Sequence, residues 1–297
     1  MKILITGANG MLGSTLTEIL LKTEHEILAT GKGEFRYTQL TFNNKSKYAS
    51  LDILNPKDIE DVVGNFKPDT IIHAAAMTQV DECEQNKELC SSVNIVASKQ
   101  LMAAAQKIGA AFYYISTDFV FSGEDGPYVE TDQTGPVNYY GESKLQTEEA
   151  LKASDLGWCI IRTVLLYGKT DHIKRANFIY WVRDSLLAQK PIKVVNDQIR
   201  TPTYIPDLAE VIIKAVELQA RGVYHISGDD ILTPYEMAIH VADYLKLNKS
   251  LITAVDAATF TQPGKRPQKT GFFIKKATEE LGYQPIKFKK ALELIFG

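Results

Sequence analysis

The sequence predicts an α/β protein with a doubly wound parallel sheet and a smaller C-terminal α/β lobe, and three observations lead to this fold class. Short apolar runs alternate with helix-like segments through about the first 165 residues. The runs are almost continuously apolar, as parallel strands are when helices cover both faces of a sheet. Such alternation indicates βαβ units. After residue 168 the alternation loosens, which indicates a separate lobe.

The strands of the sheet are expected at five apolar runs that Gly, Asp or Ser residues bound, namely residues 2–7, 25–31, 69–76, 110–116 and 158–168. A further short strand is expected just before Asp52, and the run GVYHISG at 222–228 is expected to join the same sheet. Helical patterns lie between the runs at 14–22, 94–109 and 138–152.

The C-terminal part of the chain has a sparser pattern. Helices are expected at 178–188, 206–220, 234–245 and 274–281, and short strands at 192–195 and 251–255. We therefore expect residues 1–168 and 202–228 to form the sheet domain. Residues 169–201 and 229–297 are then expected to form a smaller lobe over the ligand-binding edge of the sheet.

Composition limits the possible classes of function. The 297 residues are enough for roughly two domains. Lys and Arg number 33 against 36 Asp and Glu, and no basic run stands out, so nucleic acid and anionic membranes are poor candidate partners. No apolar run is long enough for a spanning helix. Three cysteines without a CxxC pair are typical of a reducing compartment, so we expect a cytoplasmic protein and no metal site.

A glycine-rich loop follows the first expected strand and opens the first helix. Gly7, Gly10 and Gly13 form the pattern GxxGxxG, with Met11 and Leu12 between the last two. In a dinucleotide-binding Rossmann fold such glycines allow a tight turn, close approach to the pyrophosphate and close helix packing. The N-terminus of the helix then attracts the anion. A generic tight turn is the alternative interpretation.

The end of the second strand selects between NAD and NADP, because an acidic side chain there binds the free 2′-hydroxyl of the ribose. Here the strand is expected to end at Thr30, with Lys32 and Arg36 nearby, which favours NADPH. The acidic Glu34 favours NADH instead, so NADH stays possible. Asp52 and Ile53 are candidate adenine contacts; alternatively Asp52 belongs to a helix cap, since Asn55-Pro56 follows.

A tyrosine and a lysine at helical spacing are the candidate reactive pair. Tyr140 and Lys144 lie four residues apart in an expected helix, and therefore on one face of it. A nearby cation stabilises a phenolate, so we expect Lys144 to lower the pKa of Tyr140 and make it a proton donor to a carbonyl that becomes an alkoxide. Thr117 ends a strand, where its hydroxyl can bind the reacting oxygen, although Thr also ends strands for structural reasons.

These motifs together resemble the extended short-chain dehydrogenase/reductases, and among them the dTDP-4-dehydrorhamnose reductase family. The resemblance extends over essentially the whole chain. It rests on HAAAMTQVDECEQ (73–85), the Val93-Asn94 pair, ISTDFVFSG (115–123), PVNYYGESKLQTEEAL (136–151), VVNDQIRTPTYIPDLA (194–209) and GVYHISG (222–228).

The resemblance implies a role for each matching position. Cofactor contacts are implied at Gly7, Gly10, Met11, Leu12, Gly13, Thr30, Lys32, Asp52, Ile53, Ala74, Ala75, Ala76, Thr78, Ile115, Tyr140 and Lys144. Sugar contacts are implied at Thr78, Val80, Thr117, Asp118, Tyr140 and Leu165. Tyr140 would be the acid, and Lys144 would also hold the nicotinamide ribose.

The resemblance also implies a nucleotide-sugar substrate, reduced at its 4-keto group, and a possible homodimer linked by magnesium. Lys193, Arg200 and Arg266 are candidate contacts for the substrate diphosphate, or else ordinary surface charges. Leu165 stands where some members have a tryptophan against the sugar, which leaves the hexulose open.

Two alternatives stay open. A nucleotide-sugar dehydratase or epimerase is disfavoured, because related dehydratases have a Glu after Thr-Asp where this chain has Phe119. The other is a non-catalytic regulatory subunit that binds NADP, similar to the methionine adenosyltransferase beta subunit.

Overall fold

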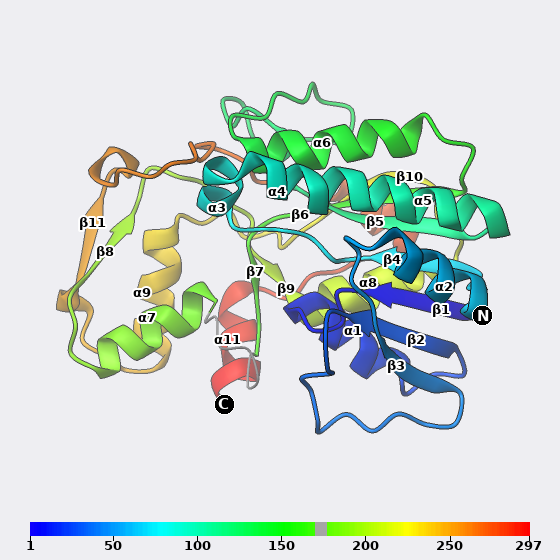
Figure 1. Ribbon diagram of the computed structural model, residues 1–297. Helices are drawn as coiled ribbons and strands as arrows, with labels where there is room; N and C mark the ends of the chain where they lie inside the picture. Colours follow the sequence, from blue (N-terminus) through cyan, green and yellow to red (C-terminus); the bar gives the residue numbers. More distant parts are fainter. Residues whose placement is uncertain (170–176) are drawn as a thin grey trace.

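The computed structural model describes residues 1–169 and 177–297, and a seven-stranded parallel sheet forms its centre (Figure 1). The strand order is β10-β6-β5-β4-β1-β2-β3. The strands are β1 (Lys2–Thr6), β2 (Glu26–Gly31), β3 (Ser46–Ser50), β4 (Thr70–His73), β5 (Ala111–Thr117), β6 (Trp158–Thr163) and β10 (Gly222–Ile226). The order reverses between β1 and β4, and ligands of such sheets bind beyond the carboxyl ends of the strands at this switch point.

Helices cover both faces of the sheet (Figure 1). On one face lie α1 (Met11–Leu20), α8 (Ile205–Glu217) and α10 (Lys275–Leu281); on the other lie α2 (Pro56–Phe66), α5 (Ala97–Ile108) and α6 (Tyr139–Lys152). Successive side chains of β1 point to opposite faces of the sheet. Ile3 and Ile5 pack in the apolar core on the side of α1 and α8, and Leu4 packs in the core on the side of α2 and α5. All three are fully buried, which explains why the strand reads as a continuous apolar run.

The C-terminal lobe has an apolar core of its own. It contains α7 (Phe178–Leu187), α9 (Pro234–Tyr244), α11 (Phe288–Phe296) and a parallel pair, β8 (Ile192–Val195) and β11 (Ile252–Val255). Single 3-10 turns occur at Asp118–Val120, Lys249–Leu251 and Ala257–Thr259. The expected lobe segment 169–201 includes residues 170–176, which lie outside the described residues.

The expected strands and helices are confirmed, with one correction. The run 158–168 was expected to be a single strand, but β6 ends at Thr163. The Thr203 hydroxyl donates to the Val164 carbonyl at 2.6 Å and accepts from the Val164 amide at 3.3 Å, so a side chain replaces the strand ladder there. Leu165 then takes a φ of 28°, and β7 (Leu166–Tyr167) pairs with β9 (Thr203–Tyr204) instead.

Four helices were not predicted: α3 (Val80–Gln85), α4 (Lys87–Ser91), α2 and α11. The first two are short and polar, and Asn86 ends one and caps the next by accepting from the Leu89 amide at 3.0 Å. Within the described residues, every helix is too short or too polar to cross a membrane.

Candidate active site

A cavity of about 580 Å³ lies at the carboxyl ends of the central strands, between the sheet and the C-terminal lobe. Its walls include most of the predicted site: Gly7, Gly10, Met11, Leu12, Gly13, Ala74, Ala76, Thr78, Val80, Ile115, Thr117, Asp118, Tyr140, Lys144, Leu165, Arg200 and Arg266. Residues from β1, β4, β5 and α6 thus meet at one place. The walls are mainly apolar, which suits a ligand whose specificity depends on a few polar contacts.

The glycine loop has the geometry that a dinucleotide requires. Gly7 has a φ of 77°, and a Cβ there would lie 2.8 Å from the Ala75 amide nitrogen. A Cβ on Gly13 would lie 2.8 Å from the Ala8 Cα, so glycine lets α1 pack against β1. Gly10 begins α1 in an extended conformation without a side-chain cap. The first amides of α1 therefore lack a capping side chain, and a diphosphate is the kind of group that satisfies such amides.

The predicted ribose contact at Thr30 is placed differently from expectation. The second strand extends to Gly31, and Thr30 is fully buried with its hydroxyl donating to the Ile5 carbonyl at 2.8 Å. Its side chain thus points into the protein and not toward a ribose. Lys32, which follows, is exposed and forms an ion pair with Asp52 at 2.7 Å. Ile53 is half-buried against the core of the sheet.

An asparagine that was not predicted ties this region to the glycine loop. The Asn9 side chain donates to the Glu34 carbonyl at 3.0 Å and accepts from the Arg36 amide at 3.0 Å. It also donates to the Tyr48 hydroxyl at 3.1 Å. Asn9 was visible in the sequence as one of the variable positions of the glycine pattern, but that pattern says nothing of what such a side chain binds.

The candidate reactive pair, Tyr140 and Lys144, lies at the start of α6. The Asn138 side chain caps this helix by accepting from the Gly141 amide at 2.9 Å. A Cβ on Gly141 would lie 2.8 Å from the Phe119 carbonyl carbon, so the helix begins in close contact with the turn after β5. Tyr140 is 9% exposed and Lys144 3% exposed, and both face the cavity. The i,i+4 spacing therefore does place both groups at one site.

Burial acts in opposite directions on the two groups. It raises the pKa of Tyr140 well above its usual value, and the Thr117 hydroxyl only partly opposes this. It lowers the pKa of Lys144 to about 7, against the opposing charge of Glu148. The Lys144 ammonium lies 4.1 Å from the centroid of the Tyr114 ring. The expected lowering of the Tyr140 pKa by Lys144 is therefore not met, because desolvation of the phenolate outweighs it.

Thr117 and Asp118 are engaged with each other. The Thr117 hydroxyl donates to an Asp118 carboxylate oxygen at 3.0 Å and accepts from the Phe119 amide at 3.3 Å. The Thr270 hydroxyl donates to the other oxygen of Asp118. Burial raises the pKa of Asp118, while the charge of Arg200 opposes this. A hydroxyl has one proton, so Thr117 must turn from Asp118 before it can donate to a substrate oxygen.

The three candidate diphosphate contacts have different positions. Arg200 is buried and donates to the Pro267 carbonyl at 2.7 Å and the Gln268 carbonyl at 3.0 Å, so it holds the C-terminal segment in place. Arg266 forms a bidentate pair with Asp81, at 2.7 Å for one of the two contacts, and lowers the pKa of that carboxyl. Lys193 is exposed on β8 and does not line the cavity.

Asn94 fixes the loop between β4 and α3, which carries Ala74 to Thr78. It lies in a π-helical turn at Ser92–Val96. Its side chain accepts from the Met77 amide at 2.8 Å, and donates to the Met77 carbonyl at 3.0 Å and to the Ser143 hydroxyl at 2.9 Å. One residue thus joins this loop to α6 in the turn before Lys144. The sequence showed it only as part of the Val93-Asn94 pair.

Some residues of the cavity wall were not predicted, namely Ser116, Phe119, Thr163, Leu166, Phe178, Gln198 and Pro234. Phe178 and Pro234 begin helices of the lobe, and the sequence has no pattern that directs them to the sheet. Predicted residues that do not line the cavity are Thr30, Lys32, Asp52, Ile53, Ala75 and Lys193. Among the described residues, no group of three or more acidic, cysteine or histidine side chains could hold a metal ion.

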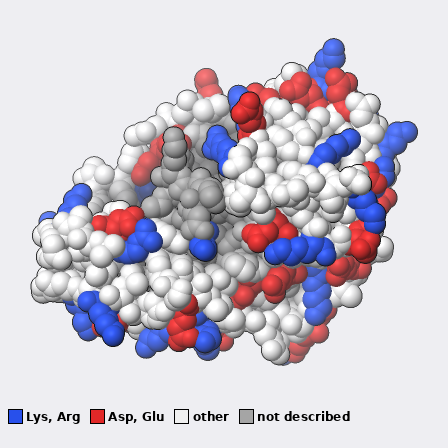
Figure 2. All heavy atoms as spheres, turned by 90° about the horizontal axis from the view of Figure 1, so that it is seen from below, with Lys and Arg blue, Asp and Glu red and all other residues white. Residues whose placement is uncertain are grey.

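The face of the molecule in Figure 2 carries both signs of charge. Lys and Arg side chains alternate there with Asp and Glu over the sheet domain and over the lobe. On the described residues of this face no extended area has a single sign.

Comparisons with known proteins give a consistent result. A family model for the RmlD substrate binding domain matches residues 1–296. The dTDP-4-dehydrorhamnose reductase of Aggregatibacter actinomycetemcomitans is 31% identical, over 99% of this chain and 98% of that protein. The methionine adenosyltransferase 2 subunit beta of Xenopus tropicalis is also 31% identical, over 83% of this chain and 73% of that protein.

A solved structure supports the same relation. The dTDP-4-dehydrorhamnose reductase of Bacillus anthracis in complex with NADP is 30% identical to this chain, with a TM-score of 0.86. The match covers 99% of this chain and 98% of that one. The likeness therefore extends over both the sheet and the C-terminal lobe.

Proposed function

This chain belongs to the RmlD substrate binding domain family, and from that premise we propose that it reduces a nucleotide-linked keto sugar with a nicotinamide cofactor. The proposed reaction is reduction of the 4-keto group of a 6-deoxyhexulose linked to a nucleoside diphosphate, as the name of the dTDP-4-dehydrorhamnose reductases implies. The observation that carries the proposal is that Tyr140 and Lys144 face a cavity that the glycine loop also lines.

The residues of the cavity divide the chemistry among them. A nicotinamide cofactor, when bound against Gly7, Gly10 and Gly13, supplies the hydride. Because burial raises the pKa of Tyr140, its phenol keeps its proton at neutral pH and can donate it to the oxygen that becomes an alkoxide. Lys144, when protonated, would bring a positive charge to this cavity wall, where it would stabilise the developing alkoxide and hold the cofactor ribose. The apolar side chains of Val80 and Leu165 would contact the sugar.

We propose NADPH as the preferred cofactor, with NADH as an alternative. β2 ends at Gly31, and the next side chain is that of the exposed Lys32 and not an acid. A basic side chain in this position suits a 2′-phosphate, and the amide of the nearby Arg36 is tied to Asn9 of the glycine loop. The ion pair of Lys32 with Asp52 is exposed, so its rearrangement around a phosphate costs little.

The test is oxidation of NADPH and of NADH, measured separately by absorbance, with a panel of dTDP- and GDP-linked 4-keto sugars. We expect turnover with NADPH and at least one dTDP-linked substrate. A lack of turnover across the panel, with cofactor binding intact, would contradict the proposed reaction.

The regulatory alternative follows from one comparison, the 31% identity to a methionine adenosyltransferase 2 subunit beta. It predicts NADP binding without oxidation of NADPH by any keto sugar, together with a stable complex with a methionine adenosyltransferase. The same panel and a binding assay with that enzyme separate the two functions.

A dehydratase is disfavoured, because Phe119 stands where related dehydratases have a second carboxylate. The Phe119 ring packs edge-on against Tyr140. Net consumption of NADPH separates reduction from redox-neutral epimerisation.

A further inference from the structure

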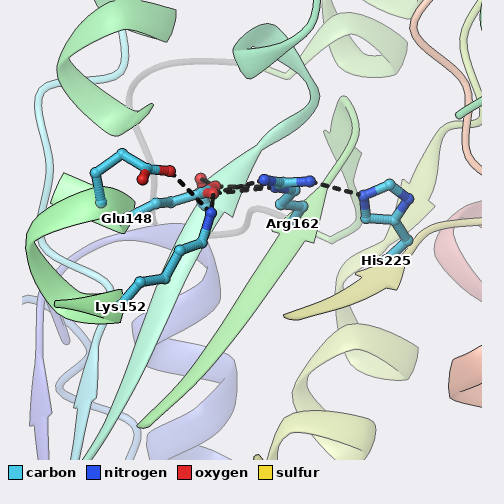
Figure 3. A network of polar contacts seen from close by, with 6 residues as sticks. Glu148, Lys152, Arg162 and His225 are labelled. Carbon is cyan, nitrogen blue, oxygen red and sulfur yellow. Dashed lines mark hydrogen bonds and ion pairs between the residues drawn. The ribbon is translucent and has the colours of Figure 1, made fainter. Parts of the chain in front are cut away.

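Glu148, one turn beyond Lys144 on α6, belongs to a buried charged network with Arg162 and His225 (Figure 3). Glu148 is fully buried and accepts from Arg162 of β6 through Nε at 3.0 Å and Nη2 at 2.7 Å. Ser116 of β5 donates to the same carboxylate at 2.5 Å. The other end of the Arg162 guanidinium lies 3.3 Å from Nε2 of His225 on β10.

Stability alone is a weak reason for such a network. Taking a carboxylate and a guanidinium out of water costs several kcal/mol for each ion, and a well-packed apolar pair is often as stable or more stable. Glu148 and Arg162 are 0% and 2% exposed, so both bear that cost in full. The function of the network is therefore argued from its position in the fold and not from its contribution to stability.

We infer that Glu148 is a positioning residue for Tyr140 and Lys144: it fixes the helix that carries both of them to β5 and β6, and it supplies the negative charge that keeps the Lys144 ammonium in its buried place. The role of Glu148 in catalysis rests on the proposed function, but the effect of Glu148 on Lys144 does not.

The mechanical part of the inference follows from the contacts. The Glu148 carboxylate joins α6 to both strands, since Ser116 belongs to β5 and Arg162 to β6. Ser116 directly precedes Thr117, so the same contact sets the height of α6 relative to the strand end. Glu148 follows Lys144 by four residues and Tyr140 by eight, which places all three on one face of the helix.

The electrostatic part follows from what surrounds Lys144. The titratable groups that face it from neighbouring elements are His73 of β4, Cys83 of α3, Cys90 of α4, Tyr114 of β5, and Tyr140 and Glu148 of its own helix. Burial lowers the pKa of His73 to about 3, so its ring is neutral, and it raises the pKa values of both tyrosines. Glu148 is the carboxylate of this group: it is fully buried, it lies one helical turn from Lys144 on the same face of α6, and its negative charge favours the ammonium.

The far end of the network reaches the C-terminal part of the chain. The His225 ring lies 3.8 Å from the Phe272 ring in a stacked arrangement, and its Nδ1 lies 3.1 Å from the Tyr128 carbonyl. Thr270, two residues before Phe272, donates to Asp118 in the cavity wall. The network therefore joins the catalytic helix to a segment that also shapes the substrate side of the cavity.

The test compares Glu148→Gln with Glu149→Gln, a matched control because Glu149 is the exposed neighbour on the same helix. We expect the apparent pKa of Lys144, measured by competitive acylation and mass spectrometry without cofactor, to fall by about one unit or more in Glu148→Gln. It should not change in Glu149→Gln. If the protein is a reductase, the alkaline limb of its kcat/KM profile moves to lower pH by the same amount, because activity is lost when the ammonium deprotonates. An unchanged pKa of Lys144 in Glu148→Gln overturns the inference.

Two further variants complete the test: one controls for a loss of folding, and the other for the titration of a nearby thiol. Glu148→Gln combined with Arg162→Gln removes both charges of the buried ion pair, so no guanidinium is left without its carboxylate. This double variant is expected to fold where the single variant does not, with the Lys144 pKa still lowered. Failure of both to fold would assign the network to the fold alone and overturn the inference. Cys90→Ser removes a thiol whose pKa its neighbour Cys83 lowers. A titration that disappears in this variant belongs to the thiol and contradicts the assignment to Lys144. Absence of keto-sugar reduction would contradict the proposed function and leave the acylation result standing.

Discussion

At the scale of single residues, Tyr140 and Lys144 share one face of a helix and one cavity, yet burial favours the neutral form of each. In the proposed reaction the neutral form of Tyr140 is the acid, so its high pKa suits proton donation to a substrate. The proposed role of Lys144 needs a positive charge, so its neutral form would be inactive. The proposed reaction thus requires a group that stabilises the charged form of Lys144, whereas Tyr140 needs no such group.

Replacement of Tyr140 by Phe should lower kcat for keto-sugar reduction by about 10²- to 10⁴-fold, because the reaction loses its proton donor while the ring keeps its packing. NADPH binding, measured by fluorescence, should be retained, because the glycine loop that also lines the cavity is unchanged. Tyr139→Phe is the matched control, since Tyr139 has Ser143 and not a lysine four residues later. Retained turnover in Tyr140→Phe would remove this residue as the acid.

The sequence predicted that these two residues share one site, but not their ionisation. Spacing of four residues is a local property, and it correctly brought Tyr140 and Lys144 to one wall. Their pKa values depend on burial against distant elements such as α3 and α4, which no local pattern describes. Thr30 shows the same limit: its place near a strand end was visible, but whether its hydroxyl faces a ligand or Ile5 depends on the sheet.

At the scale of elements, the change from β6 to β7 shows how one hydroxyl ends a strand. An apolar run from 158 to 168 looks like a single strand in the sequence, because all of its side chains suit one. The interruption comes from Thr203, which lies far along the chain and binds both the amide and the carbonyl of Val164. The missed helix α11 is different, since its buried residues Phe288, Ala291, Leu292 and Ile295 have helical spacing that was already in the sequence.

Replacement of Thr203 by Val keeps the shape of the side chain and removes both hydrogen bonds to Val164. Two buried backbone groups then lack partners, so we expect the free energy of unfolding to fall by about 1–3 kcal/mol. Urea denaturation monitored by circular dichroism measures this change. Thr253→Val, on the exposed side of β11, is the control and should change stability by less than about 0.5 kcal/mol. Equal stabilities for the two variants would contradict the account of the strand end.

At the scale of the whole molecule, a few long-range contacts join residues 267–272 to the loop before α6 and to the loop before β9. Tyr128 and Phe272 form a bridge, and the Ile199 amide donates to the Gln268 carbonyl at 2.7 Å. Arg200 binds the backbone of the same segment from within the protein. The sequence predicted a lobe over the sheet and the order of most elements. It could not predict these contacts, because they pair residues about 70 to more than 140 positions apart whose local patterns are unremarkable.

Replacement of Arg200 by Met should therefore loosen the segment 267–268 and the cavity wall together. The carbonyls of Pro267 and Gln268 lose charged donors, so we expect a loss of stability on the order of 3 kcal/mol. Substrate KM should rise more than the dissociation constant for NADPH, since the glycine loop lies on the other side of the cavity. Thermal unfolding and steady-state kinetics check both expectations, with the exposed Arg221→Met as control. If KM and stability do not change, Arg200 does not hold the wall.

The tie between Asp118 and Thr270 also has a consequence for the order in which the site is completed during synthesis. A ribosome releases the sheet strands as far as β6 long before residues 267–272 emerge, and the earlier part of a chain generally folds first. A nascent chain at that stage has the glycine loop, Tyr140 and Lys144, but Asp118 lacks the Thr270 hydroxyl. His225 and its stacking partner Phe272 arrive late as well. A chain whose synthesis stops before residue 267 thus contains Tyr140 and Lys144 but lacks the residues that complete the cavity wall.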